Sequence, residues 1–396
     1  MGPGLLAGLS DDDPAGITTY SVLGADYGYR LLWVLTLSTI ALIVFHQIAA
    51  RTGVVTGKGL AALVRERYGG RAVSIALTAL VVANVGTLCA EFAGIAAGMQ
   101  LLTGTSRYVA VPVFALGISL LVLRGSFHRV EHVLLALSAV FVTYIAAGVV
   151  AHPDWGATLH GLVVPGMPVT RRSMLDAVAT LGTTLAPWGL AFMQSYAVDK
   201  RLTVADLRYE RLDVAAGAVM TGVIGMFIVV ACAATLHVHG FRVQDAGDAA
   251  QALGPLVGDF ATTLFGLGIL GAAVLAAAIV PLSTAYSVAE GLGQPGGLDL
   301  TAREAPAFYG AFGAAVVVAA GLVLLPGVPL VPVLVLSQAL NAVLLLAVLP
   351  FLRALALDQA VMGEHHLRRF GRVGTAVLLA MVAVSVLALA VLVVVG

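Results

Sequence analysis

Apolar segments of about 20 residues recur along the whole chain, which is the length that an α-helix needs to cross a bilayer. Hydrophobic residues make up 60% of the sequence and charged residues only 11%, against roughly a quarter in soluble domains. The sequence therefore predicts an all-α polytopic membrane protein with about eleven transmembrane helices in one transmembrane domain, 1–396. Its net charge is zero, so no global field indicates a nucleic-acid partner.

Charges in the connecting loops predict how the chain crosses the bilayer. The expected spans are 3–27, 31–50, 72–102, 109–123, 131–151, 173–200, 213–235, 260–290, 306–325, 328–351 and 373–395. Most of the 21 Lys and Arg residues fall in loops on the side of the N-terminus. The positive-inside rule then predicts a multi-pass protein of the plasma (inner) membrane, with its N-terminus in the cytoplasm and its C-terminus outside. No signal peptide is evident.

Two of the expected spans, the first and the sixth, are broken by an X-Pro step inside an apolar run. The breaks fall at Asp13-Pro14 and at Ala186-Pro187. Five spans separate them, so a repeat that begins at the sixth span would be inverted relative to the first. This pattern is typical of inverted-repeat transporters with a site at the breaks. We expect a first repeat over 1–151, a second over 173–353 and an extra helix over 373–395.

The first break carries three successive carboxyl groups, Asp11, Asp12 and Asp13. Carboxylates inside a membrane are costly unless they face water, a partner or a cation, and the proline frees backbone carbonyls beside them. Oxygen ligands of this kind suit a hard divalent cation such as Mg²⁺, Mn²⁺ or Ca²⁺. The alternative is that the triplet ends a loop before a shorter helix.

The second break frees the carbonyls near Thr183, although an ordinary proline kink is the alternative.

Glu91 lies deep in the third span and shares a helix face with Asn84 and Thr87. Two roles for its carboxylate remain open, namely a proton or gating role and a structural pair with an arginine. Gln338 and Asn341 share a face of the tenth span, where they line the ion path or bond to neighbouring helices.

Polar residues elsewhere give weaker indications. His46 is expected at the membrane interface, and Gln194 and Ser195 in an outer vestibule. Cys89 and Cys232 are expected to be small core residues. The chain has no HExxH motif, no nucleophile elbow in context and no Walker-type phosphate loop, so we expect neither an enzyme nor ATP-driven transport, and no cofactor.

Several motifs resemble those of the Nramp divalent-metal transporters. The residues that carry the resemblance are 2–8 with Asp13-Pro14, then 29–57, 65–68, 153–155 and 336–338. The resemblance covers most of the chain and implies the LeuT-type (APC) fold, with the first five and the next five helices as inverted repeats. It also implies that Asp13 matches the family's metal-binding aspartate.

Departures from the family pattern concern the ligands and the proton path. Gly16 stands where the family has asparagine, and Ala186 where it has a methionine that favours transition metals. Leu88 and Trp188 replace a titratable aspartate and histidine, while Glu91 remains. These changes look like the Nramp-related magnesium transporter branch, which implies uptake of a hydrated ion without proton coupling.

The leading prediction is a secondary transporter that imports Mg²⁺, and also Mn²⁺, as a partly hydrated ion. Asp13 is expected to be the principal ligand and Gln338 to join it; the other expected metal-site residues are Asp12, Asp11, Ser10, Thr183 and Ala186. The expected gating or pathway residues are Glu91, Trp188, Gly16 and Asn341. The expected partners are the ion and the lipid bilayer, and the chain is expected to function as a monomer. The alternatives are a proton-coupled Mn²⁺/Fe²⁺ importer of the ordinary Nramp kind, an organic-solute carrier and a non-transporting sensor or scaffold.

Overall fold

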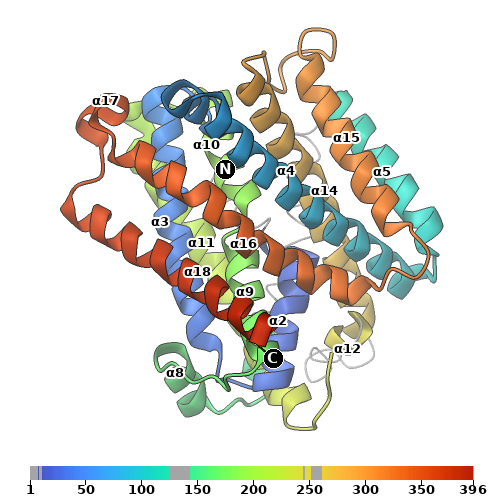
Figure 1. Cartoon of the computed structure of the whole chain (residues 1–396). Helices are drawn as coiled ribbons and strands as arrows, with labels where there is room; N and C mark the ends of the chain where they lie inside the picture. The colour runs from blue at the N-terminus through green and yellow to red at the C-terminus, as the bar shows by residue number, and fades with distance from the viewer. Residues whose placement is uncertain (1–7, 9–10, 125–142, 244–245, 251–260, 396) are drawn as a thin grey trace.

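Helices are the only regular elements in the part of the chain that the computed structural model describes, which is residue 8 and the ranges 11–124, 143–243, 246–250 and 261–395 (Figure 1). The α-helices are α2 (Pro14–Tyr27), α3 (Leu32–Thr56), α4 (Leu60–Thr103), α5 (Arg107–Leu123), α7 (Thr143–Val150), α8 (Trp155–Val163), α9 (Arg171–Thr184), α10 (Pro187–Asp199), α11 (Leu207–Cys232), α12 (Ala246–Ala250), α14 (Ala261–Leu292), α15 (Pro306–Val323), α16 (Leu330–Leu357), α17 (Gln359–Met362) and α18 (Arg369–Val395).

The expected membrane spans largely correspond to these helices. Within the described residues, seven helices are long and apolar enough to cross a membrane, and α5 is a shorter apolar helix. The first and sixth spans appear as short pieces, namely α2 and the pair α9 and α10. The expected span 131–151 lies mostly outside the described residues, and α7 covers its end.

Three local features differ from the sequence-based expectation. The third span begins at Leu60 rather than at 72, because a short helical segment precedes a bend at Gly69, whose φ of 84° lies in the region that favours glycine. Residues after Pro153 form the short helix α8, which Asp154 caps by accepting a hydrogen bond from the Ala157 amide (2.9 Å). Helix α11 continues as a π-helical turn, Ala233–His237.

The broken helices lie in the middle of the bundle. Helix α4 packs along α14 and α16, while α11 packs along α3 and α2, so these longer helices surround α2, α9 and α10 (Figure 1). Residues 11–24 and 176–197 are buried throughout, which is consistent with this central position. The longer helices therefore form a packed frame around the two breaks.

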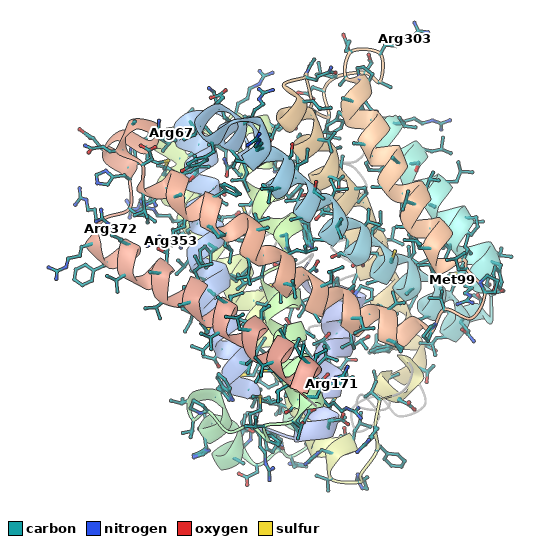
Figure 2. The ribbon with its side chains drawn as sticks, viewed as in Figure 1. Arg67, Met99, Arg171, Arg303, Arg353 and Arg372 are labelled. Atoms are coloured by element: carbon teal, nitrogen blue, oxygen red, sulfur yellow. The ribbon has the colours of Figure 1, made fainter. Side chains whose placement is uncertain are left out.

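Some arginines of the predicted loops can be located in the structure. In Figure 2, Arg67 and Arg303 lie in the upper part of the view, Arg353 and Arg372 on its left side, and Arg171 in its lower part. The first four are in the loops that the sequence assigns to the cytoplasm. Which side of the bundle faces the cytoplasm stays a prediction of the positive-inside rule.

Candidate metal-ion site

The first helix break is formed by Asp12 and Asp13, which are not helical, and α2 starts directly after them at Pro14. Asp13 is the N-cap of α2, and its Oδ1 accepts a hydrogen bond of 2.5 Å from the Gly16 amide. Proline suits the first helical position because its missing N–H would have no partner there. The sequence thus ends one helix and starts another at the carboxylates.

Burial makes this acidic triplet unusual. Asp11, Asp12 and Asp13 are 1%, 2% and 3% exposed, and the carboxylate oxygens of Asp11 and Asp12 have no hydrogen-bond partner among the described residues. No ion pair joins any of the three to a basic side chain in that part of the chain. Buried carboxylates without partners are unfavourable, so the arrangement fits a position that holds a cation. The alternative from the sequence, that the triplet ends a loop before a shorter helix, does not by itself account for the burial of these unpartnered carboxylates.

The second break separates α9 from α10 at Leu185 and Ala186. Leu185 has φ −110° and ψ 50°, and Ala186 has φ −63° and ψ 134°, so neither residue continues the helix. Pro187 has no N–H, so the carbonyl group of Thr183 lacks the donor that a continuous helix would supply. This is a complete interruption of the helix rather than the ordinary proline kink that remained possible from the sequence.

The two breaks meet beside Gly16. A Cβ atom on Gly16 would lie 3.0 Å from the carbonyl oxygen of Asp11 and 3.2 Å from both Asp13 Oδ1 and Thr183 Oγ1. The Thr183 hydroxyl is buried and has no other partner among the described residues. In the neighbouring turn, the hydroxyl groups of Tyr20 and Thr184 are hydrogen-bonded at 3.1 Å. Three oxygen atoms from both breaks therefore surround the position that glycine leaves without a side chain.

Glu91 of α4 completes this acidic region. It is fully buried near Asp13, and neither of its carboxylate oxygens has a hydrogen-bond partner among the described residues. Gly94 lets α4 approach the first break closely, because a Cβ there would lie 2.4 Å from the Pro14 ring. The structure shows no arginine paired with Glu91 within the described residues, contrary to one of the two expectations for it.

Helix α16 contacts the second break through its backbone. A Cβ on Gly182 would lie 1.8 Å from the Gln338 carbonyl oxygen, so α9 and α16 touch directly. The Asn341 amide donates hydrogen bonds to Gln338 Oε1 (3.0 Å) and to Thr87 Oγ1 (2.9 Å) on α4. Gln338 therefore lies next to the break, and Asn341 holds its side chain and joins α16 to α4.

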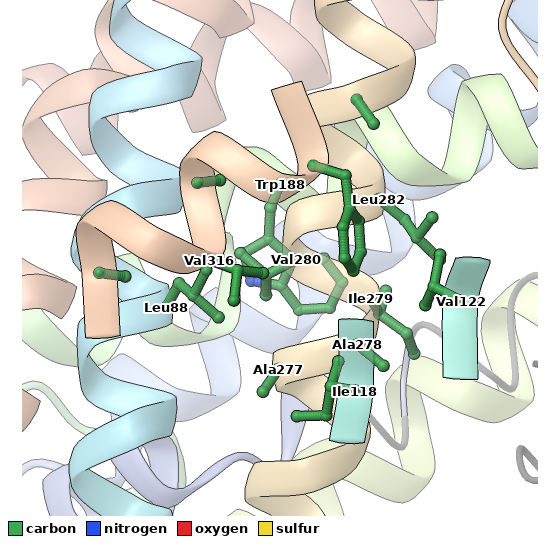
Figure 3. Close-up of a cluster of buried hydrophobic side chains, with 14 of the residues drawn as sticks. Leu88, Ile118, Val122, Trp188, Ala277, Ala278, Ile279, Val280, Leu282 and Val316 are labelled. Carbon is green, nitrogen blue, oxygen red and sulfur yellow. The ribbon is translucent and has the colours of Figure 1, made fainter. Parts of the chain in front are cut away.

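Leu88, Ala186 and Trp188 belong to one buried hydrophobic cluster formed with α5, α14 and α15. Figure 3 shows Trp188 in this cluster with Leu88 and Val280. The Ala186 methyl group offers no ligand atom to the break. Ser10, an expected carbonyl ligand, lies outside the described residues.

Two further expectations from the sequence are wrong. His46 is 2% exposed and lies next to Gly189 at the second break, so it is not an interfacial residue. Ser195 lines a cavity of about 310 Å³ together with Lys58 and Arg65, which belong to a predicted cytoplasmic loop rather than to an outer vestibule. Burial inside a bundle depends on neighbouring helices that a sequence position does not specify.

The donor set of the site is oxygen-rich but sparse. In the described part of the chain, no three His, Cys, Asp or Glu side chains come together as a group that could hold a metal ion. An ion between the breaks would therefore depend on Asp13, backbone carbonyls, hydroxyl groups and water. Oxygen donors of this kind suit hard divalent cations.

Comparisons with known proteins agree with this architecture. A family model described as "Natural resistance-associated macrophage protein-like" (Nramp) matches residues 4–393. The divalent metal cation transporter MntH of Aeromonas hydrophila is 30% identical over 377 residues, which cover 92% of this chain and 88% of the relative. MntH of Bacillus subtilis is 31% identical over 296 residues, covering 72% and 68%.

Solved structures show the same fold at lower sequence identity. A mutant of the Eremococcus coleocola manganese transporter superposes with a TM-score of 0.77 at 18% identity, covering 98% of this chain and 84% of that one. MhsT in complex with L-phenylalanine gives a TM-score of 0.59 at 15% identity, covering 97% and 98%. These likenesses establish the LeuT-type fold.

Proposed function

The chain belongs to the Nramp family, and we propose that it is a secondary transporter that imports divalent metal ions, with Mg²⁺ as its main cargo and Mn²⁺ as a second. Members of this family are transporters and not enzymes. Relatives named divalent metal cation transporters, and a structural neighbour named a manganese transporter, support the class of cargo. The preference for Mg²⁺ rests on the residues of this chain.

One observation carries the preference, namely the three oxygen atoms that surround the empty side-chain position of Gly16. Asp13 supplies the charge, while the Asp11 carbonyl and the Thr183 hydroxyl supply neutral oxygens. No thioether is added at Ala186, so the soft ligand that would favour transition metals is missing. Asp13 then binds the ion mainly through water, and Asp11 and Asp12 attract it and remove part of its hydration shell.

Proton coupling would need a chain of titratable groups that leads from the site to the other side of the membrane. Glu91 is buried near Asp13, but Leu88 and Trp188 belong to a hydrophobic cluster and cannot take up a proton. A proton released from Asp13 or Glu91 would then return to the side from which the ion enters, and it would move no net charge. The ion therefore travels without a proton.

The membrane potential alone is then sufficient to drive entry. Two charges that cross a potential of roughly 100 mV gain about 4.6 kcal/mol, which favours accumulation inside the cell. Alternating access arises when α2, α9 and α10 move against the frame formed by the longer helices. The repeats 1–151 and 173–353, the extra helix 373–395 and a monomeric functional unit belong to this proposal.

A proton-coupled Mn²⁺ importer is the second candidate, because the relatives include proteins named as manganese transporters. Purified protein in proteoliposomes separates the two, with Mg²⁺ and Mn²⁺ uptake and lumenal pH followed by fluorescent dyes. We expect Mn²⁺ uptake that excess Mg²⁺ inhibits, without acidification of the lumen. Acidification that tracks Mn²⁺ uptake, together with no effect of Mg²⁺, would establish the second candidate. Metal binding without any flux would indicate a sensor or scaffold instead.

A further inference from the structure

His46 of α3 is a buried imidazole that the proposed path does not yet use. It is 2% exposed, and its Nε2 atom has no hydrogen-bond partner among the described residues. Water cannot satisfy a nitrogen so deeply buried unless a space beside it admits water or an ion. The direction in which this atom points therefore decides what it can do.

The Nε2 atom points toward Gly189 in the first turn of α10. Gly189 follows the second break and also lies near Asp11 of the first break. A Cβ atom on Gly189 would lie 3.2 Å from His46 Nε2 and 3.8 Å from Asp11 Oδ1. Both oxygens of the Asp11 carboxylate are themselves buried and without a partner in the described part of the chain. The His46 nitrogen of α3 and the Asp11 carboxylate of the first break thus lie next to the same space, where Gly189 of α10 has no side chain.

This pair of ligands has a chemistry different from that of the oxygen set at Gly16. Imidazole suits Zn²⁺, Cu²⁺, Fe²⁺ and Ni²⁺ and binds Mn²⁺ less tightly, whereas Mg²⁺ prefers oxygen ligands and gives up its waters reluctantly. An ion bound to Nε2 can reach the Asp11 carboxylate directly or through one water. A site that contains both groups would therefore favour ions that accept a nitrogen ligand.

We propose that His46 and Asp11 form a second ion position beside Gly189, at which transition-metal ions exchange a water for the imidazole nitrogen while Mg²⁺ does not. His46 is then a specificity-determining residue of the transport path. It supplies a nitrogen ligand in a chain in which Ala186 offers no thioether. This proposal rests on the proposed function, because the second position belongs to the same ion path.

Electron spin-echo spectroscopy of bound Mn²⁺ tests the ligand directly, since it detects the ¹⁴N nucleus of a coordinating imidazole. The tag-free protein is studied in detergent with Mn²⁺ as the probe. We expect a ¹⁴N coupling in the wild type that is absent in His46→Gln and in Gly189→Ala, where the added methyl group fills the space. His160→Gln, which changes an exposed histidine of α8, is the matched control and should keep the coupling.

Uptake in proteoliposomes gives a second readout. His46→Gln should raise the Mn²⁺ concentration for half-maximal uptake by about tenfold, as loss of one metal-site partner commonly does. The Mg²⁺ concentration for half-maximal uptake should stay within about twofold of the wild-type value. A wild type without ¹⁴N coupling, or a coupling that persists in His46→Gln, would overturn the second ion position. If divalent uptake continued in that case, the proposed transport function would stand; absence of all uptake by folded protein would instead refute the transport function.

Discussion

Leu88 of α4 and Trp188 of α10 lie in the same buried hydrophobic cluster, and at most 1% of either residue is exposed (Figure 3). Both positions correspond to titratable residues in the Nramp pattern that the sequence resembles. The structure shows that the two replacements are not isolated, because they join side chains of α5, α14 and α15 in one apolar core. Trp188 is thus part of this apolar core, and its role in the ion path stays a prediction.

Replacement of Trp188 by alanine should destabilise the protein. The change removes one of the largest fully buried side chains, and Trp→Ala substitutions in cores cost about 3–5 kcal/mol. Thermal unfolding in detergent measures the loss. Trp188→Phe should keep most of the stability and uptake within about twofold of the wild type. Loss of uptake in a stable Trp188→Phe protein would argue for a direct role in the path.

Replacement of Asp13 by asparagine should separate its charge from its role as a helix cap. Asparagine caps α2 as well as aspartate does, whereas alanine costs about 1 kcal/mol more. We expect Asp13→Asn to fold normally but to lose at least about tenfold in Mg²⁺ and Mn²⁺ uptake, because removal of a charged ligand costs 1.4 kcal/mol or more. Asp26→Asn is the matched control. Asp26 lies away from the breaks, and its carboxylate pairs with the Arg172 guanidinium at a distance of 2.6 Å. Normal uptake by Asp13→Asn would show that the ion binds elsewhere.

Replacement of Ala186 by methionine should shift the ion preference toward transition metals. The thioether adds a soft ligand beside the second break. The Mg²⁺ concentration that halves Mn²⁺ uptake should therefore be about tenfold higher for the variant than for the wild type. Leu185→Met adds the same group at the neighbouring position, which packs in a different hydrophobic cluster, and should leave the competition unchanged. Equal competition in both variants would mean that residue 186 does not reach the ion.

Replacement of Gly182 by alanine should disturb the contact between α9 and α16. The new Cβ would lie 1.8 Å from the Gln338 carbonyl oxygen, so the helices must separate, at a cost of about 1–3 kcal/mol. Thermal unfolding and metal uptake should both report the change. Gly321→Ala in α15, where nothing lies within 4 Å of the added atom, should be neutral or slightly stabilising. Equal behaviour of the two variants would contradict the close approach.

Cysteine labelling tests the predicted orientation. Both native cysteines, Cys89 and Cys232, are buried, so they should give little background. A membrane-impermeant maleimide applied to intact cells should label Val238→Cys, which is 72% exposed in a predicted outer loop. Ala302→Cys, exposed in a predicted cytoplasmic loop, should react only after the membrane is opened. The opposite pattern would place the N-terminus outside.

Features that depend on local chemistry were predictable from the sequence. Apolar runs of sufficient length predict spans whatever their neighbours are, and a proline within such a run predicts where its helix opens. The breaks at Asp13-Pro14 and Ala186-Pro187 are therefore found in the structure as predicted. The start of the third span was misplaced because Leu60–Tyr68 is helical in a polar segment that no span pattern marks.

Features that depend on packing were decided only by the tertiary structure. Gly16 and Thr183 are 167 positions apart, and the sequence alone could not show that their atoms face each other. The same holds for the burial of Glu91 near Asp13, and for the burial of His46, which the sequence suggested at the interface. Hydrophobicity and proline act within one helix, whereas the geometry of an ion site depends on how closely separate helices approach, and small residues such as Gly94 and Gly182 determine that distance.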